Sequence, residues 1–126
     1  MSKVPVIVLV EDDSQLLAMY KERFQKEKFI VATASDGENA ILVVNREKPD
    51  IVLLDLMLPK KGGINVLQII KSNPETSNIP VVILTAYPQD EYKNAVKRSG
   101  AVEFISKSET MPGEVVEKVK KIIGWK

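Results

Sequence analysis

Five short apolar runs recur along the chain, and each is separated from the next by a stretch with helical spacing. The runs occupy residues 6–10, 29–34, 51–54, 81–84 and 101–105. Each is within the length of a β-strand. Parallel strands need long crossover connections, which are usually helices and which cover both faces of the sheet. The alternation therefore predicts a doubly wound α/β fold, with a five-stranded parallel sheet between five helices.

Helical spacing is clear in the first and last of these intervening stretches and weak in one of them. Residues 89–98 have only a thin apolar face, made by Tyr92, Ala95 and Val96. A helix with few apolar contacts is held weakly, so we expect this segment to be a candidate mobile element. The stronger stripes comprise Leu16, Leu17, Tyr20 and Phe24, and then Val115, Val116, Val119, Ile122 and Ile123.

The length of 126 residues suits one domain, and we expect residues 1–126 to form a single domain without an output domain. No apolar run approaches the roughly 20 residues that a membrane span needs, and the N-terminus lacks a signal-peptide pattern. These features predict a cytoplasmic protein that does not contact a membrane. The formal net charge of +1 gives no general attraction to nucleic acid.

The absence of cysteine and histidine restricts the chemistry that this chain can perform. Without cysteine there is no disulfide framework, no thiol catalysis and no thiolate metal site. Without histidine there is no imidazole triad, no histidine-bound zinc and no phosphohistidine on the chain itself. Any metal site must therefore be built from oxygen ligands.

Carboxylates stand at the ends of two of the predicted strands. Asp55 closes the run IVLLD, while Glu11, Asp12 and Asp13 follow the run VIVLV. A buried and unpaired charge costs several kcal/mol, but the carboxyl edge of a parallel sheet is where open α/β folds build their sites. We expect Asp13 to cap the following helix, because carboxylates favour that position. The other three carboxylates should share one edge of the sheet.

The ends of two further strands would add Thr85 and Lys107 to the same edge. At about 5 Å and an effective dielectric near 20, each pair of carboxylates repels by about 3 kcal/mol, which one lysine cannot offset. A divalent cation is the simplest remedy, and oxygen ligands indicate Mg²⁺, with Mn²⁺ or Ca²⁺ as alternatives. Two carboxylates to hold a metal, a third to attack, and a hydroxyl and an ammonium for the incoming oxygens predict a phosphoryl-acceptor site.

Four motifs in this order resemble the receiver domains of two-component response regulators, and the resemblance covers essentially the whole chain. The motifs are VLVEDD, VLLDLMLP followed by Gly63, ILTA and FISK. Each motif alone is weakly specific, but the ordered set is strong. The resemblance implies a flavodoxin-like sheet with strand order 2-1-3-4-5, as in single-domain regulators of the chemotaxis type.

The resemblance also implies a role for each residue of the site. Asp55 would be the phosphoacceptor, and Lys107 would contact the phosphoryl group. Thr85 would be the switch hydroxyl and Phe104 the switch aromatic. The ligands of Mg²⁺ would be Glu11, Asp12, Asp55 and the backbone carbonyl of Met57.

The chain departs from the common family pattern at three positions. Ser108 follows Lys107 where proline is usual, and a cis Lys-Ser bond would cost about 3–4 kcal/mol, so a trans bond and a differently placed lysine are expected. Gly62 replaces a polar residue, which predicts a looser loop. Phe104 lacks the tyrosine hydroxyl that is often found there, so an inward state would depend on packing alone.

We therefore expect a phosphorylation switch that receives its phosphoryl group on Asp55 from a histidine kinase or a phosphotransfer protein. Output would work through contact with a downstream effector protein, and the chain would be a monomer or a weak dimer. Lys60 and Tyr87 would flank the site and tune the lifetime of the phosphoryl group.

The principal alternative is a metal-dependent phosphatase that uses Asp55 as a covalent nucleophile. Phosphatases of the haloacid dehalogenase type place an acidic residue two positions after the nucleophile, where this chain has Met57. A nucleotide-binding domain would need a glycine-rich loop after the first strand, but EDDSQLL would repel phosphate. An unphosphorylated scaffold of the same fold would not need the complete set of site residues.

Overall fold

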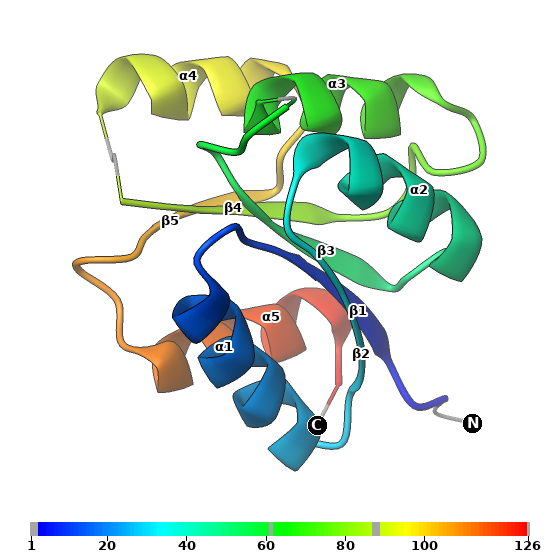
Figure 1. Ribbon diagram of the computed structural model, residues 1–126, viewed down its shortest axis with the longest axis vertical. Coiled ribbons are helices and arrows are strands. Elements are labelled where there is room, and N and C mark those ends of the chain that lie inside the picture. Colours follow the sequence, from blue (N-terminus) through cyan, green and yellow to red (C-terminus); the bar gives the residue numbers. More distant parts are fainter. Residues whose placement is uncertain (1–2, 61, 87–88, 126) are drawn as a thin grey trace.

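Strands and helices alternate along the whole chain, as Figure 1 shows. The structure is a computed structural model that describes residues 3–60, 62–86 and 89–125. The first half contains β1 (Val6–Val10), α1 (Ser14–Lys26), β2 (Ile30–Ala34), α2 (Gly37–Glu47) and β3 (Ile51–Asp55). The second half contains α3 (Gly63–Ser72), β4 (Val81–Thr85), α4 (Asp90–Arg98), β5 (Glu103–Ser106) and α5 (Pro112–Ile123).

The five strands form one parallel sheet in the order β2-β1-β3-β4-β5. Strand β1 therefore lies between β2 and β3, while the later strands add outward from β3. The prediction of a doubly wound α/β fold is confirmed, and so is the strand order implied by the family resemblance. In this topology the carboxyl ends of all five strands point to one edge of the sheet.

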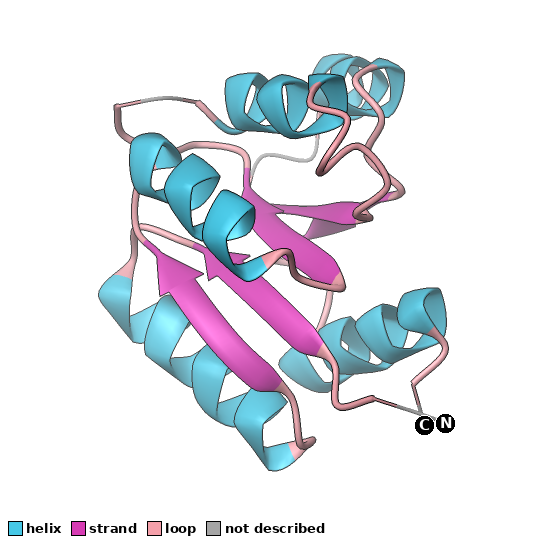
Figure 2. Ribbon diagram, turned by 90° about the vertical axis from the view of Figure 1, so that its right-hand side faces the viewer, coloured by secondary structure: helices cyan, strands magenta, loops and turns pink. Residues whose placement is uncertain are grey.

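Apolar side chains alternate between the two faces of the sheet and build a core on each. In β1, Ile7 and Leu9 pack with α1 and α5, whereas Val8 and Val10 pack with α2, α3 and α4. Figures 1 and 2 show the corresponding layers, with helices on both sides of the sheet. Because both faces are covered, β3 and β4 are buried at every position, which explains why their sequences are continuous apolar runs.

The ends of the elements follow the sequence signals closely, except at the fifth strand. That strand begins at Glu103, two residues later than the apolar run predicted. The amide of Ala101 still donates to the carbonyl of Val96, and Gly100 has a φ of 101°. These residues therefore complete the end of α4, in a backbone conformation that glycine adopts without a steric penalty.

Side-chain capping fixes where two of the helices begin. Asp13 accepts hydrogen bonds from the amides of Gln15 and Leu16, which confirms its predicted role at the start of α1. Asp36 caps α2 through the amide of Asn39.

Among the described residues, no helix is long and apolar enough to cross a membrane.

Helix α4 is held as weakly as its sequence predicted. Val96 is its one buried residue, and the helix is otherwise strongly polar. Helix α5 buries Val115, Val116 and Val119 against the opposite face of the sheet. The thin apolar face of residues 89–98 is thus confirmed, while its mobility stays a prediction.

Candidate functional site at the carboxyl edge of the sheet

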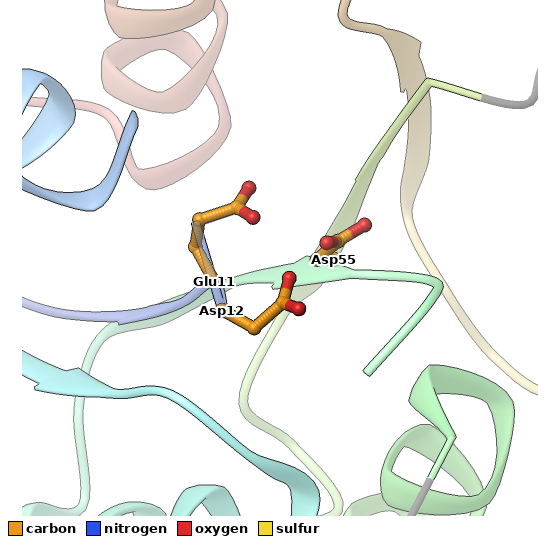
Figure 3. A group of neighbouring side chains, drawn as sticks. All are labelled: Glu11, Asp12 and Asp55. Atoms are coloured by element: carbon orange, nitrogen blue, oxygen red, sulfur yellow. The ribbon is translucent and has the colours of Figure 1, made fainter. Parts of the chain in front are cut away.

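The register of the central strands brings three carboxylates together. Val10 pairs with Leu54, so the residues that follow them, Glu11 and Asp55, emerge side by side at the edge of the sheet. Glu11, Asp12 and Asp55 each offer a carboxylate oxygen within 4.8 Å of the others (Figure 3). Glu11 and Asp55 are buried, whereas Asp12 is exposed. The predicted meeting of these carboxylates is therefore found in the structure.

Lys107 enters the same site from the loop after β5. Its amide donates to the carbonyl of Thr85 at 2.7 Å, which fixes the backbone beside the end of β4. Its Nζ lies 2.6 Å from Oε1 of Glu11 and 3.4 Å from Oδ2 of Asp55. The lysine therefore contacts two carboxylates at once, and the shorter contact is with Glu11.

Burial and crowding alter the proton affinity of the two central groups. Burial, together with the negative charge of Glu11, raises the pKa of Asp55 from 3.8 to about 6, although Lys107 opposes both effects. Burial lowers the pKa of Lys107, but its bond to Glu11 and the charge of Asp55 outweigh this, so the pKa is raised overall. One ammonium thus leaves Asp55 with an unfavourable environment for its charge.

The bond between Lys107 and Ser108 is trans, because no cis bond occurs among the described residues. The structure agrees with the conformation expected from the missing proline. Lys107 nonetheless reaches the carboxylates. The hydroxyl oxygens of Ser106 and Ser108 lie 3.1 Å apart, a hydrogen-bonded pair that closes the turn on either side of the lysine.

Of the other predicted residues, Thr85 lies at the end of β4, Phe104 lies within β5, and Met57 follows β3. Thr85 is completely buried at the end of β4 and is paired with Ser106 of β5. Phe104 is half-buried against the core on the α4 side. The amide of Met57 donates to Oδ1 of Asp55 at 3.3 Å, and the Met57 residue is 49% exposed.

Sequence patterns gave no sign that Tyr20 belongs to this neighbourhood. It was assigned only to the apolar stripe of α1, yet it lines a small pocket together with Glu11 and Asp55. Burial raises the pKa of Tyr20, and the charge of Lys107 offsets only part of that increase. A tyrosine in a helical apolar stripe looks like ordinary core, so only the packing of α1 on the sheet reveals its position.

Of the two residues expected to flank the site, Lys60 is described and Tyr87 lies outside the described residues. Nζ of Lys60 lies 3.7 Å from Oδ2 of Asp36 at the start of α2. No sequence signal connects these two residues. Their contact depends on how the loop after β3 packs on the start of α2, the helix that precedes β3 in the chain.

Comparison with known proteins places this arrangement in a family. The family model for the response regulator receiver domain matches residues 7–120. The chain belongs to this family. It is thus a receiver domain of two-component response regulators, and the family resemblance of its four motifs is confirmed.

Curated relatives extend well beyond the receiver domain. The chain is 38% identical over 104 residues to the probable transcriptional regulatory protein TcrX of Mycobacterium tuberculosis. That match covers 82% of this chain and 44% of TcrX. The response regulator PleD of Caulobacter vibrioides is 35% identical over 101 residues, covering 80% of this chain and 22% of PleD. The chain therefore spans less than half the length of these relatives.

Solved structures confirm the fold independently. The BeF₃-activated N-terminal receiver domain of Klebsiella pneumoniae RstA superposes with a TM-score of 0.86 at 30% identity, covering 94% of this chain and 97% of that one. The receiver domain of sensor histidine kinase PA1611 from Pseudomonas aeruginosa superposes with a TM-score of 0.87 at 21% identity, covering 97% and 99%. The latter structure contains a magnesium ion coordinated in its active site cleft.

Proposed function

We propose that Asp55 accepts a phosphoryl group and that the resulting charge switches this receiver domain between two states. The observation that supports this most directly is the cluster of Glu11, Asp12 and Asp55, with Lys107 in contact with two of its members. Glu11 and Asp55 both contact Lys107, and each accepts a hydrogen bond from a backbone amide. We assign the nucleophile to Asp55 because it stands at the phosphoacceptor position of the receiver-domain motif VLLDLMLP.

The donor set of this cluster fits Mg²⁺. Three carboxylates, with no histidine or cysteine in the chain, are the hard oxygen ligands that this ion prefers. The raised pKa of Asp55 indicates that the one nearby ammonium does not fully balance the negative charge. Glu11, Asp12, Asp55 and the carbonyl of Met57 would hold the ion. When bound, Mg²⁺ supplies positive charge that offsets the repulsion between the carboxylates and the incoming phosphoryl oxygens.

The chemical step needs little from the protein beyond position and charge. One Oδ of Asp55 forms a bond to phosphorus while the bond from phosphorus to the imidazole nitrogen of the donor phosphohistidine breaks. The electron pair of that bond stays on the nitrogen, which then takes up a proton. Lys107 and the hydroxyl of Thr85 would receive the phosphoryl oxygens and so orient and stabilise the acyl phosphate.

Phosphorylation adds about −1.5 to −2 charges at the edge of the sheet. Lys107 would then be drawn from Glu11 toward the phosphoryl group, and Thr85 would move with it. Both residues border the segment that leads to α4, which is held by Val96 alone among its buried residues. A shift of this helix, with Phe104 following inward, would change the surface offered to a partner.

The proposed partners follow from this chemistry. A histidine kinase or a phosphotransfer protein supplies the phosphoryl group, and a downstream effector protein recognises one of the two states. The cytoplasm, where kinases of this kind keep their phosphohistidines, is the proposed location. We propose that residues 1–126 act as a monomer or weak dimer, without direct contact to nucleic acid or membrane.

The phosphatase alternative has no residue to support it at the critical position. Met57 stands two positions after Asp55 and cannot donate a proton to a leaving group. We therefore propose that the phosphoryl chemistry of the chain is limited to its own phosphorylation and to hydrolysis of its own acyl phosphate.

Incubation with Mg²⁺ and acetyl phosphate, followed by intact-mass measurement, tests the proposal. The wild type should gain one phosphoryl group, and Asp55→Asn should gain none. Asp13→Asn is the matched control, because it removes a neighbouring carboxylate whose capping role asparagine can retain. An unmodified wild type under conditions that phosphorylate another receiver domain, or an adduct on Asp55→Asn, would contradict the assignment. Repeated turnover of a phosphate ester would instead favour the phosphatase.

A further inference from the structure

The loop between β3 and α3, of which residues 56–60 and 62 are described, has its two ends joined by a backbone hydrogen bond. The amide of Gly63 donates to the carbonyl of Leu56 at 2.9 Å. A side chain at Gly63 would overlap the backbone of Asp55 and Leu56, so glycine is required for this closure. The loop starts directly after the proposed phosphoacceptor, so any change in its conformation alters the backbone next to that residue.

The start of α2 contacts the same loop at two further points. The amide of Gly37 donates to the carbonyl of Pro59 at 3.3 Å, and Nζ of Lys60 lies 3.7 Å from Oδ2 of Asp36. Asp36 is itself held by Asn39, whose amide and side-chain nitrogen donate to it at 2.8 and 3.0 Å. Asp36 is only 7% exposed and is held by hydrogen bonds, so it presents a fixed negative charge to the exposed Lys60 side chain.

Lys60 has an unusual backbone conformation for a residue with a side chain. Its φ of 68° lies in the left-handed region, which disfavours every residue except glycine. A favourable interaction of its ammonium therefore helps to keep the loop in a conformation that the backbone alone would disfavour. Lys48 offers a natural comparison, with a φ of 45° and an ion pair to Glu75 at 3.0 Å.

Met57 connects this loop to the site. Its amide donates to Oδ1 of Asp55, and its carbonyl belongs to the proposed set of metal ligands. We propose that Asp36 and Lys60 are positioning residues, which hold this loop so that Met57 is in place for Asp55 and for a divalent cation. The part of the inference that concerns the cation rests on the proposed function. Neither residue belongs to the acidic cluster, so the start of α2 becomes a determinant of cation affinity.

Charge-neutralising variants at both positions test this inference. Asp36→Asn removes the charge but keeps a side chain that can cap α2, and Lys60→Gln removes the ammonium. Lys60→Arg preserves the charge and should restore wild-type behaviour. Lys48→Gln is the matched control, because it removes the ion pair of another lysine whose backbone is in the left-handed region. The measurements are amide hydrogen exchange at Met57 and Leu58 in EDTA, and the Mg²⁺ dissociation constant from a titration monitored by NMR.

Asp36→Asn and Lys60→Gln should each speed exchange at these two amides and weaken Mg²⁺ binding by about two- to fivefold, the size typical of an exposed ion pair. The double variant should show no more than the larger single effect, because both changes remove one interaction. Unchanged exchange, unchanged Mg²⁺ affinity or an equal effect of Lys48→Gln would overturn the inference. Neither measurement involves phosphoryl transfer, so a failure of the proposed function at Asp55 would be recognised separately.

Discussion

The interior of the sheet and its carboxyl edge are built by the same strands but follow opposite rules. In the interior, Val52 and Ile83 are completely buried among apolar neighbours. Three residues beyond Val52 and two beyond Ile83, Asp55 and Thr85 are also buried, but they are polar. Packing stabilises the interior, whereas burial of Asp55 disfavours its charged form. The comparison indicates that the edge has been built for chemistry at the expense of stability.

The largest effect is expected from a cavity in the interior. Ile83→Ala should lower the free energy of unfolding by about 3–4 kcal/mol, because it removes packing from a position that is fully buried. Ile122→Ala on α5, where the side chain is about one-third exposed, is the control and should cost about 1 kcal/mol or less. Urea unfolding followed by circular dichroism measures both. Equal losses would break the distinction between interior and surface.

Loss of the lysine at the edge should come next. Lys107→Met leaves Glu11 and Asp55 buried without their shared cation, which should cost about 2–3 kcal/mol in EDTA. Much of this loss should disappear in the background of Asp55→Asn, because one of the two unpaired charges is then absent. A double-mutant cycle by urea unfolding measures this coupling. Strictly additive effects would show that the lysine and Asp55 do not interact.

Removal of the charge at Asp55 should change the free energy of unfolding in the opposite direction. Asp55→Asn should raise the free energy of unfolding by about 1–3 kcal/mol at pH 7.5 in EDTA, since it replaces a carboxylate whose pKa burial raises to about 6. A destabilised Asp55→Asn variant would refute the claim that the edge sacrifices stability.

The pH dependence of that difference gives an independent check. The folded protein holds a proton on Asp55 up to about pH 6, whereas the unfolded chain loses it near 3.8. The contribution of Asp55 to stability is therefore present below pH 3.8 and is lost as the pH rises through 6. The advantage of Asp55→Asn over the wild type should grow from pH 4 to pH 6 and then level off. A constant difference across this range would exclude the raised pKa.

The smallest effect is expected for an ion pair on the surface. On α1, Nζ of Lys26 lies 3.4 Å from Oε1 of Glu22, and the two side chains are 74% and 72% exposed. Glu22→Gln should change the free energy of unfolding by less than about 0.5 kcal/mol, because water and salt screen such a pair. Comparison of this variant with Lys107→Met isolates the effect of burial, because the Lys107 ion pairs are largely buried and the Lys26 ion pair is exposed. A loss as large as that of Lys107→Met would contradict the role given to burial.

Much of this molecule could be predicted because local sequence signals agree with its topology. The alternation of short apolar runs and helical stripes gave the fold class and nearly all the element positions. The fifth strand was the exception, since the apolar pattern cannot distinguish the end of α4 from the first residues of a strand. The edge carboxylates could be predicted too, because strands of a parallel sheet end on the same side.

The sequence by itself determined which residues would meet at the carboxyl edge, through strand ends that place Glu11 and Asp55 side by side. Only the tertiary structure decided how they meet. It placed Lys107 nearer to Glu11 than to Asp55, put Tyr20 beside their pocket, and joined Asp36 to Lys60. Periodicity specifies the face and the end of each element, whereas contacts within 4 Å depend on side-chain conformations and on the packing of segments that are far apart in the chain.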